Sequence, residues 1–250
     1  MKTKRRITFF LTVFCVFGLL PVSGVQAAPD PAQVEMVENI RQDTLNLIES
    51  QRTDGSVLLL TFEALYEPLN KEQRDFLDRL RALKPSLTQL EPQDVQWVKL
   101  ENQKMMVDGT EQIIPPQMLP QNVFDAYQTM NKAMFEEIGK RLLVESGYRS
   151  PAYQLYLFVF FMPNHDYSIS ETERHVALPG RSEHGRPERQ AIDFINEQGI
   201  NGEYNPPEFE ALPEYVWLQA NANRFGFYLS YPRGGHSAFE PWHWHYRPAD

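Results

Sequence analysis

The sequence contains a single cysteine, Cys15, among its 250 residues. One cysteine allows no intramolecular disulfide and no thiolate metal cluster. Cys15 also lacks the small residues that precede the cysteine of a lipoprotein cleavage site, so we expect no lipidation. The fold must therefore be stabilised by its hydrophobic core and by any bound metal.

Basic residues are scarce relative to acidic ones. The chain has 24 Lys and Arg against 33 Asp and Glu, which gives a net charge of −9. A surface of this sign repels the phosphates of nucleic acids and anionic lipid headgroups. We therefore expect no nucleic-acid partner, and no membrane partner once the N-terminal segment described next has been removed.

Only one long apolar run is present, and it lies at the N-terminus. Four basic residues precede the sixteen-residue run 7–22, and the small-x-small sequence Val25-Gln26-Ala27 follows it. The run is short for a spanning helix, whereas the whole pattern is typical of a secretory signal peptide. We expect cleavage near Ala27 and a location in the periplasm or elsewhere in the cell envelope, with an uncleaved membrane anchor as the alternative. Removing residues 1–27 takes away four basic and no acidic residues, which leaves 20 basic against 33 acidic residues and a net charge of −13.

Residues 28–93 are predicted to form a helical extension. Apolar residues recur at helical spacing in two stripes, which consist of Val37, Ile40, Leu47 and Ile48, and of Phe76, Leu77, Leu80 and Leu83. No titratable residues in this segment stand at a catalytic or metal-ligand spacing. We therefore expect it to pack against the rest of the chain or to dock a partner.

From residue 94 the pattern becomes a mixture of strands and helices. Strands are expected near residues 95–100, 104–107, 142–145, 227–231 and 242–247, and helices over about 122–138, from 151 and over 213–225. Asn122 is predicted to cap the first of these helices, Gly139 to end it and Ser150 to cap the next. Because strands and helices alternate without a regular βαβ repeat, the predicted fold class is α+β.

Three motifs in this second part carry ionisable side chains. They read SGYRSPAYQ from Ser146, SEHGRPERQAID from Ser182 and EPWHWHY from Glu240. A catalytic zinc takes three nitrogen or oxygen ligands and leaves a fourth position for water, and two histidines with one aspartate supply that set without a thiolate.

The expected ligands are His184, Asp193 and His243. Glu240 precedes His243 by three residues. A carboxylate at that spacing can lie beside the metal-bound water without binding the metal. We therefore expect Glu240 to be the general base.

Taken in this order, the three motifs resemble those of the zinc D-Ala-D-Ala carboxypeptidases and dipeptidases of vancomycin-resistance type. The wider fold group of that family includes the hedgehog signalling domain. The resemblance covers about residues 95–250, and it implies a catalytic domain over 94–250 with a central antiparallel sheet and flanking helices. It also implies zinc as the cofactor and peptidoglycan stem peptides as the substrate, with hydrolysis of the terminal D-Ala-D-Ala bond or a related one. By the same resemblance, Arg149 would stabilise the transition state, and Gln154, Ser182 and Tyr148 would bind the substrate.

One segment departs from the family pattern. The family has its histidine and aspartate seven positions apart, whereas His184 and Asp193 are nine apart, and Arg189 stands where a glycine is expected. This indicates a two-residue insertion within residues 185–190. Because extra loop residues cost little free energy, we expect metal binding to survive while access to the site changes. The alternative function is a catalytically impaired protein of the same fold that binds peptidoglycan or regulates a partner.

The residues around the third motif leave some roles open. His245 could replace His243 as a ligand, lie beside the metal or point to solvent, and we favour the second. Trp242 and Trp244 fall on the opposite face of the expected strand and are predicted to pack in the core. Glu183 is expected to be solvated or to lie beside the metal ligands. The remaining histidines, His165, His175 and His236, have no pattern that predicts a role.

Overall fold

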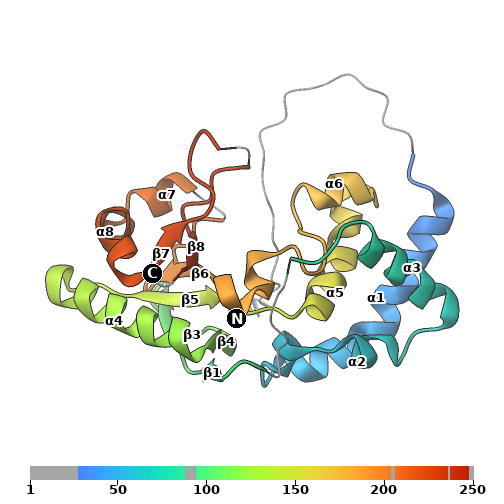
Figure 1. Cartoon of the computed structure of the whole chain (residues 1–250), viewed down its shortest axis with the longest axis horizontal. Coiled ribbons are helices and arrows are strands. Elements are labelled where there is room, and N and C mark those ends of the chain that lie inside the picture. Colours follow the sequence, from blue (N-terminus) through green and yellow to red (C-terminus); the bar gives the residue numbers. More distant parts are fainter. Residues whose placement is uncertain (1–27, 88–93, 204–205, 236, 248–250) are drawn as a thin grey trace, which may run out of the picture.

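The structure, a computed structural model, describes residues 28–87, 94–203, 206–235 and 237–247 (Figure 1). The predicted signal peptide with Cys15, and also His236, lie outside the described residues. Within the described ranges, no helix is both long enough and apolar enough to cross a membrane.

The N-terminal part is helical, as predicted. It contains α1 (Pro31–Arg52), a 3-10 turn (Ser56–Leu59), α2 (Phe62–Tyr66) and α3 (Lys71–Ala82). The Asn70 side chain accepts a hydrogen bond from the Gln73 backbone, and the Gln73 side chain accepts one from the Asn70 backbone. This reciprocal capping box fixes the start of α3. The predicted apolar stripe of α3 ends one turn early, because Leu83 is 52% exposed.

These N-terminal helices surround α5 (Pro151–Phe161), to which α6 (Ile169–Glu173) also packs (Figure 1). Nearly every residue of α5 is buried, which is expected of a helix that is apolar on all sides. Ser150 caps α5 by accepting a hydrogen bond from the Tyr153 backbone, and its hydroxyl donates to the Leu60 carbonyl at 2.7 Å. The N-terminal segment is therefore hydrogen-bonded to the start of α5, directly after Arg149, and it shares one hydrophobic core with α5.

The strands confirm the α+β class. They are β1 (Trp97–Leu100), β2 (Lys104–Val107), β3 (Thr110–Ile113), β4 (Gln117–Pro120), β5 (Leu142–Ser146), β6 (Ala191–Asn196), β7 (Phe227–Leu229) and β8 (His243–Tyr246). β1 pairs with β4, β2 pairs with β3, and the remaining four form an antiparallel sheet in the order β5-β6-β8-β7.

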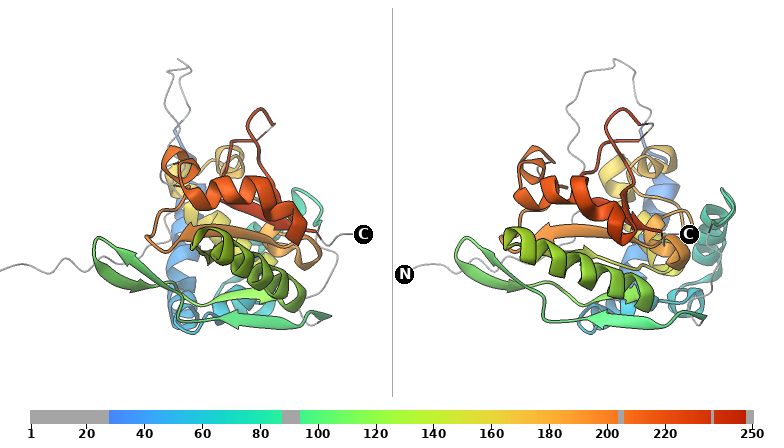
Figure 2. Two further views of the ribbon diagram at one scale, coloured as in Figure 1. Left: turned by 90° about the vertical axis from the view of Figure 1, so that its left-hand side faces the viewer. Right: turned by 60° about the vertical axis from the view of Figure 1, so that its left-hand side comes forward.

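One face of this four-stranded sheet is covered by helices. α4 (Gln121–Ile138) and α8 (Pro213–Asn221) lie side by side against it, and the short α7 (Pro206–Glu210) packs on α8 (Figure 2). Ile192 and Phe194 of β6 belong to the core shared with these helices. Because side chains alternate along a strand, Asp193 between them points to the opposite face of the sheet.

The prediction that Asn122 caps α4 is wrong. β4 continues its pairing with β1 as far as Pro120, and α4 begins immediately afterwards with Pro120 as its N-cap. The backbone N–H of Gln121 donates to the Gln96 carbonyl at 2.8 Å, so one of the N–H groups at the helix start is satisfied without a side-chain cap. The predicted stop at Gly139 is confirmed, with φ of 67° in the left-handed region that favours glycine.

Candidate metal centre

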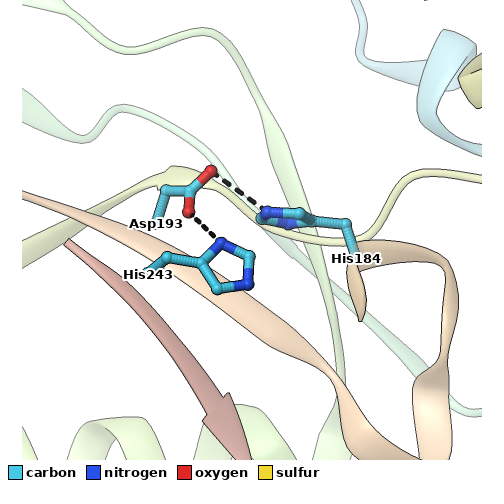
Figure 3. Close-up of side chains that lie close together, drawn as sticks. All are labelled: His184, Asp193 and His243. Carbon is cyan, nitrogen blue, oxygen red and sulfur yellow. Dashed lines mark hydrogen bonds and ion pairs between the residues drawn. The ribbon is translucent and has the colours of Figure 1, made fainter. Parts of the chain in front are cut away.

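The structure brings the three predicted ligands together. Asp193 of β6 is paired directly with His243 of β8, and His184 lies on the 3-10 turn Glu183–Gly185. His184 Nε2 is 3.1 Å from Asp193 Oδ2, and His243 Nδ1 is 2.8 Å from Asp193 Oδ1 (Figure 3). One donor atom from each of the three residues lies within 4.8 Å of the others. Two imidazoles and one carboxylate in this arrangement form a donor set that suits zinc.

The orientation of His184 is fixed by the backbone around it. Its Nδ1 lies 2.8 Å from the Gly147 carbonyl oxygen. Because a carbonyl can only accept, Nδ1 carries the proton and Nε2 is left facing Asp193. A Cβ on Gly147 would lie 2.4 Å from the Met118 carbonyl oxygen. The glycine of the first motif therefore lets β5 approach β4 closely enough to place this carbonyl.

Charges within the cluster support metal binding. Burial alone would raise the pKa of Asp193, but the two histidines outweigh it and hold that pKa far below its ordinary value. Burial lowers the pKa of His184 to about 4. Burial also acts to lower the pKa of His243, but the Asp193 charge and hydrogen bond overcome it and raise the value to about 10. The cluster thus carries one carboxylate charge balanced by one proton, and a divalent cation can displace that proton.

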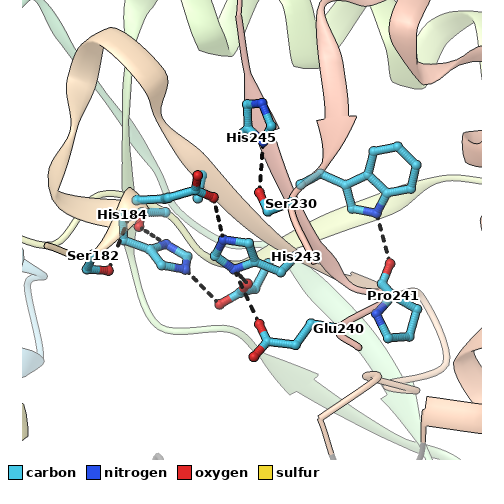
Figure 4. A network of polar contacts seen from close by, with 12 residues as sticks. Ser182, His184, Ser230, Glu240, Pro241, His243 and His245 are labelled. Carbon is cyan, nitrogen blue, oxygen red and sulfur yellow. Dashed lines mark hydrogen bonds and ion pairs between the residues drawn. The ribbon is translucent and has the colours of Figure 1, made fainter. Parts of the chain in front are cut away.

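Glu240 lies at the edge of this cluster. Its Oε2 is 4.0 Å from His243 Nδ1 (Figure 4). Burial raises the pKa of Glu240 to about 7. A partly buried carboxylate next to the donor atoms, with a pKa near neutrality, can accept and return a proton.

Arg149 is attached to the same turn. Its backbone N–H donates to the His184 carbonyl at 3.0 Å, and its charge contributes to the lowered pKa of His184. The Arg149 Nε is buried and makes no hydrogen bond within the described part of the chain. The guanidinium therefore has donor capacity left for a ligand.

The three predicted substrate-binding residues have structural contacts. Ser182 Oγ accepts a hydrogen bond from the His184 backbone and so caps the turn that carries this ligand. Tyr148 is fully buried, with its ring 4.2 Å from that of Trp97. Gln154 Nε2 donates to a backbone carbonyl at residue 177. None of these contacts assigns a substrate role, so that role stays a prediction.

His245 is not part of the cluster of donor atoms. Its ring is 7% exposed, so the solvent-facing alternative is wrong, and its Nδ1 lies 2.8 Å from Ser230 Oγ (Figure 4). Trp244 belongs to the hydrophobic core, as predicted. His245 therefore lies near His243 as a partner of other polar groups.

Two further carboxylates near the cluster were missed in the sequence. Burial raises the pKa of Glu145 to about 7 and that of Glu203 to about 8, and the Asp193 charge adds to both shifts. Glu145 stands at an irregularity in the pairing of β5 with β6, directly before the residue that pairs with Asp193. A bulge of this kind changes the direction of a side chain next to a functional site, and no short sequence motif predicts it.

The comparisons with known proteins agree with this geometry. The family model described as VanY, D-alanyl-D-alanine carboxypeptidase, matches residues 116–249, which is more than half of the chain. A Bacillus subtilis (strain 168) protein named "Putative carboxypeptidase YodJ" is 30% identical over 143 residues, which are 54% of this chain and 49% of that protein. The chain thus spans about half the length of this curated relative.

Two solved structures are also similar. One is a mutant of the vancomycin-resistance D,D-pentapeptidase VanY from the VanB-type resistance cassette, in complex with Zn(II), at 25% identity, covering 53% of this chain and 74% of that chain with a TM-score of 0.42. The other is the LdcB LD-carboxypeptidase, at 27% identity, covering 63% of this chain and 69% of that chain with a TM-score of 0.47. Both TM-scores are below 0.5, so the assignment rests on the family match. The chain belongs to the VanY D-alanyl-D-alanine carboxypeptidase family.

Proposed function

We propose that this protein is an exported zinc metallopeptidase. It hydrolyses the terminal D-Ala-D-Ala bond, or a related bond, of peptidoglycan stem peptides in the cell envelope. The observation that carries the proposal is the buried cluster of His184, Asp193 and His243 with Glu240 beside it. The donor set fits zinc because it has three nitrogen and oxygen ligands, a fixed His184 tautomer and a carboxyl group whose pKa is held far below its ordinary value.

Zinc in this site would supply Lewis acidity, which lowers the pKa of water to about 7 and polarises a peptide carbonyl. The protein's own contribution is proton transfer and charge stabilisation. Glu240 accepts the proton of the attacking water and later gives it to the departing amine. Burial of Glu240 favours this exchange, because it raises the pKa of the carboxyl group to about 7 and so makes both protonation states accessible near neutrality.

Replacing Arg149 with alanine is expected to lower kcat by about 10²- to 10³-fold, because a preorganised donor to a tetrahedral oxyanion is worth about 3–4 kcal/mol. Steady-state hydrolysis of a pentapeptide checks this. Arg149→Lys should lose less, since it keeps the charge. Arg141→Ala is the matched control, because Arg141 is exposed and stacks on Phe135 of α4. An Arg149→Ala enzyme within about twofold of wild type contradicts the assigned role.

The bond that is cut is tested by product identification. Purified zinc-loaded protein is incubated with tetrapeptide, pentapeptide and cross-linked muropeptides, and the products are identified by mass spectrometry. Release of one alanine from the pentapeptide is the expected result. A different fragment, from the tetrapeptide or a cross-link, keeps the mechanism and changes the substrate. No cleavage of any substrate by protein with stoichiometric zinc contradicts the proposal and favours a peptidoglycan-binding protein.

A further inference from the structure

The imidazole of His243 has carboxylates at both of its nitrogens. Nδ1 faces Asp193 Oδ1 at 2.8 Å and Glu240 Oε2 at 4.0 Å. Nε2, on the other edge of the ring, lies 3.2 Å from Glu183 Oε2. Because an ionised carboxylate only accepts, the Nε2–H of His243 donates to Glu183. Glu183 therefore contacts the edge of the ring that faces away from Asp193, which makes it a partner of the ligand and not a fourth ligand.

Glu183 is held in place by residues from two other parts of the chain. Arg189 Nε is 3.3 Å from Glu183 Oε1. Ser230 acts to lower the pKa of the same carboxyl group, which places its hydroxyl near Glu183. Ser230 Oγ also lies 2.8 Å from His245 Nδ1 (Figure 4). A serine hydroxyl can accept one hydrogen bond and donate another, so Ser230 can link His245 to Glu183.

Arg189 comes from the segment that departs from the family pattern. It ends the 3-10 turn Pro187–Arg189 and stands where the family has a glycine. A glycine has no side chain that could reach Glu183. The longer loop between His184 and Asp193 therefore supplies a contact to the network behind His243.

We propose that Glu183 is a positioning residue for the metal ligand His243, and that Arg189 of the longer loop and Ser230 hold Glu183 in that position. This inference rests on the proposed zinc site. In metal sites generally, the group that accepts the free N–H of a ligating histidine fixes the tautomer and the ring orientation, and its removal weakens metal binding by about 10- to 100-fold. The longer loop would then support the metal site as well as change access to it.

The test is zinc affinity, measured by competition with a chromophoric chelator on the purified protein. Glu183→Ala should bind zinc about 10- to 100-fold more weakly than wild type. Glu183→Gln should lose less, because its amide oxygen can still accept from His243 and its shape is nearly unchanged. Glu188→Ala is the matched control, since Glu188 lies in the same loop and pairs with Arg186. Its zinc affinity should stay within about twofold of wild type.

A second readout separates positioning from general stability. Nitrogen-15 NMR of the histidine rings should show His243 with its proton on Nε2 in zinc-loaded wild type, and a changed Nε2 signal in Glu183→Ala. Arg189→Ala should weaken zinc binding by only a few-fold, because the Arg189 side chain is 42% exposed and exposed ion pairs contribute little. Arg186→Ala should not weaken it.

The outcomes separate the proposed zinc site from the positioning role of Glu183. Wild-type protein that does not bind zinc overturns the proposed function and this inference together. The inference alone is overturned if wild-type protein binds zinc and Glu183→Ala binds it with the wild-type affinity and an unchanged His243 signal. If Glu183→Ala does not fold, Glu183→Gln decides: replacing the carboxylate by a neutral amide should change the Nε2 signal of His243, and a signal identical to wild type overturns the inference.

Discussion

Glu240→Gln is expected to lower kcat for stem-peptide hydrolysis by about 10²- to 10⁴-fold, the range that general acid–base catalysis contributes. Glutamine fills the same volume but cannot accept the proton of the attacking water. Glu240 Oε2 is 4.0 Å from His243 Nδ1, and Glu240 is not one of the three residues whose donor atoms cluster, so it lies beside them. Zinc content should therefore remain at one equivalent. Single-turnover kinetics together with metal analysis measure both quantities.

The matched control for this variant is Glu136→Gln, which makes the same chemical change on the exposed surface of α4. It should keep wild-type turnover. Glu240→Gln turnover within about threefold of wild type, with zinc bound, would remove Glu240 from the mechanism and leave the base unassigned.

Asp193→Asn is expected to weaken zinc binding by more than about 100-fold, because loss of a ligand costs more than loss of a group behind one. The substitution removes the charge that lies between the two histidines at 3.1 and 2.8 Å. It also replaces one of the two carboxylate oxygens that face the histidine ring nitrogens with an amide nitrogen. Chelator competition measures the affinity, and hydrolysis at one equivalent of zinc should be lost with it.

Asp125→Asn is the control for this second change, since Asp125 is exposed on α4 and its side chain accepts a hydrogen bond from the nearby Gln121. It should bind zinc as wild type does. If Asp193→Asn binds zinc with wild-type affinity, Asp193 is not a ligand and the donor set has been assigned incorrectly.

Local sequence signals predicted the elements that are fixed by nearby residues. Gly139 and Ser150 mark a helix end and a helix start because the left-handed backbone and the capping hydroxyl are local requirements. The start of α4 was mispredicted because β4 depends on pairing with β1, about twenty residues earlier, and not on its own short sequence. β4 begins directly after the proline pair 115–116, a sequence that by itself favours a break in regular structure.

The candidate site was predictable where its residues stand in ordered motifs, and not where the fold alone brings groups together. His184, Asp193 and His243 were chosen from the sequence, and the structure places their donor atoms side by side. Glu145 and Glu203 were missed because a strand irregularity and a loop place them near Asp193. The boundary between the helical extension and the catalytic domain stays a prediction, although the N-terminal helices share a core with α5.

The central claim is that zinc in the cluster of His184, Asp193 and His243 enables hydrolysis of a stem peptide. The most direct test is to remove metal from the purified protein, add zinc in small steps, and follow D-alanine release from a pentapeptide. The account predicts no release without metal and a linear rise that ends at one equivalent of zinc. Full activity in the metal-free protein, or no release at one tightly bound equivalent, would contradict it.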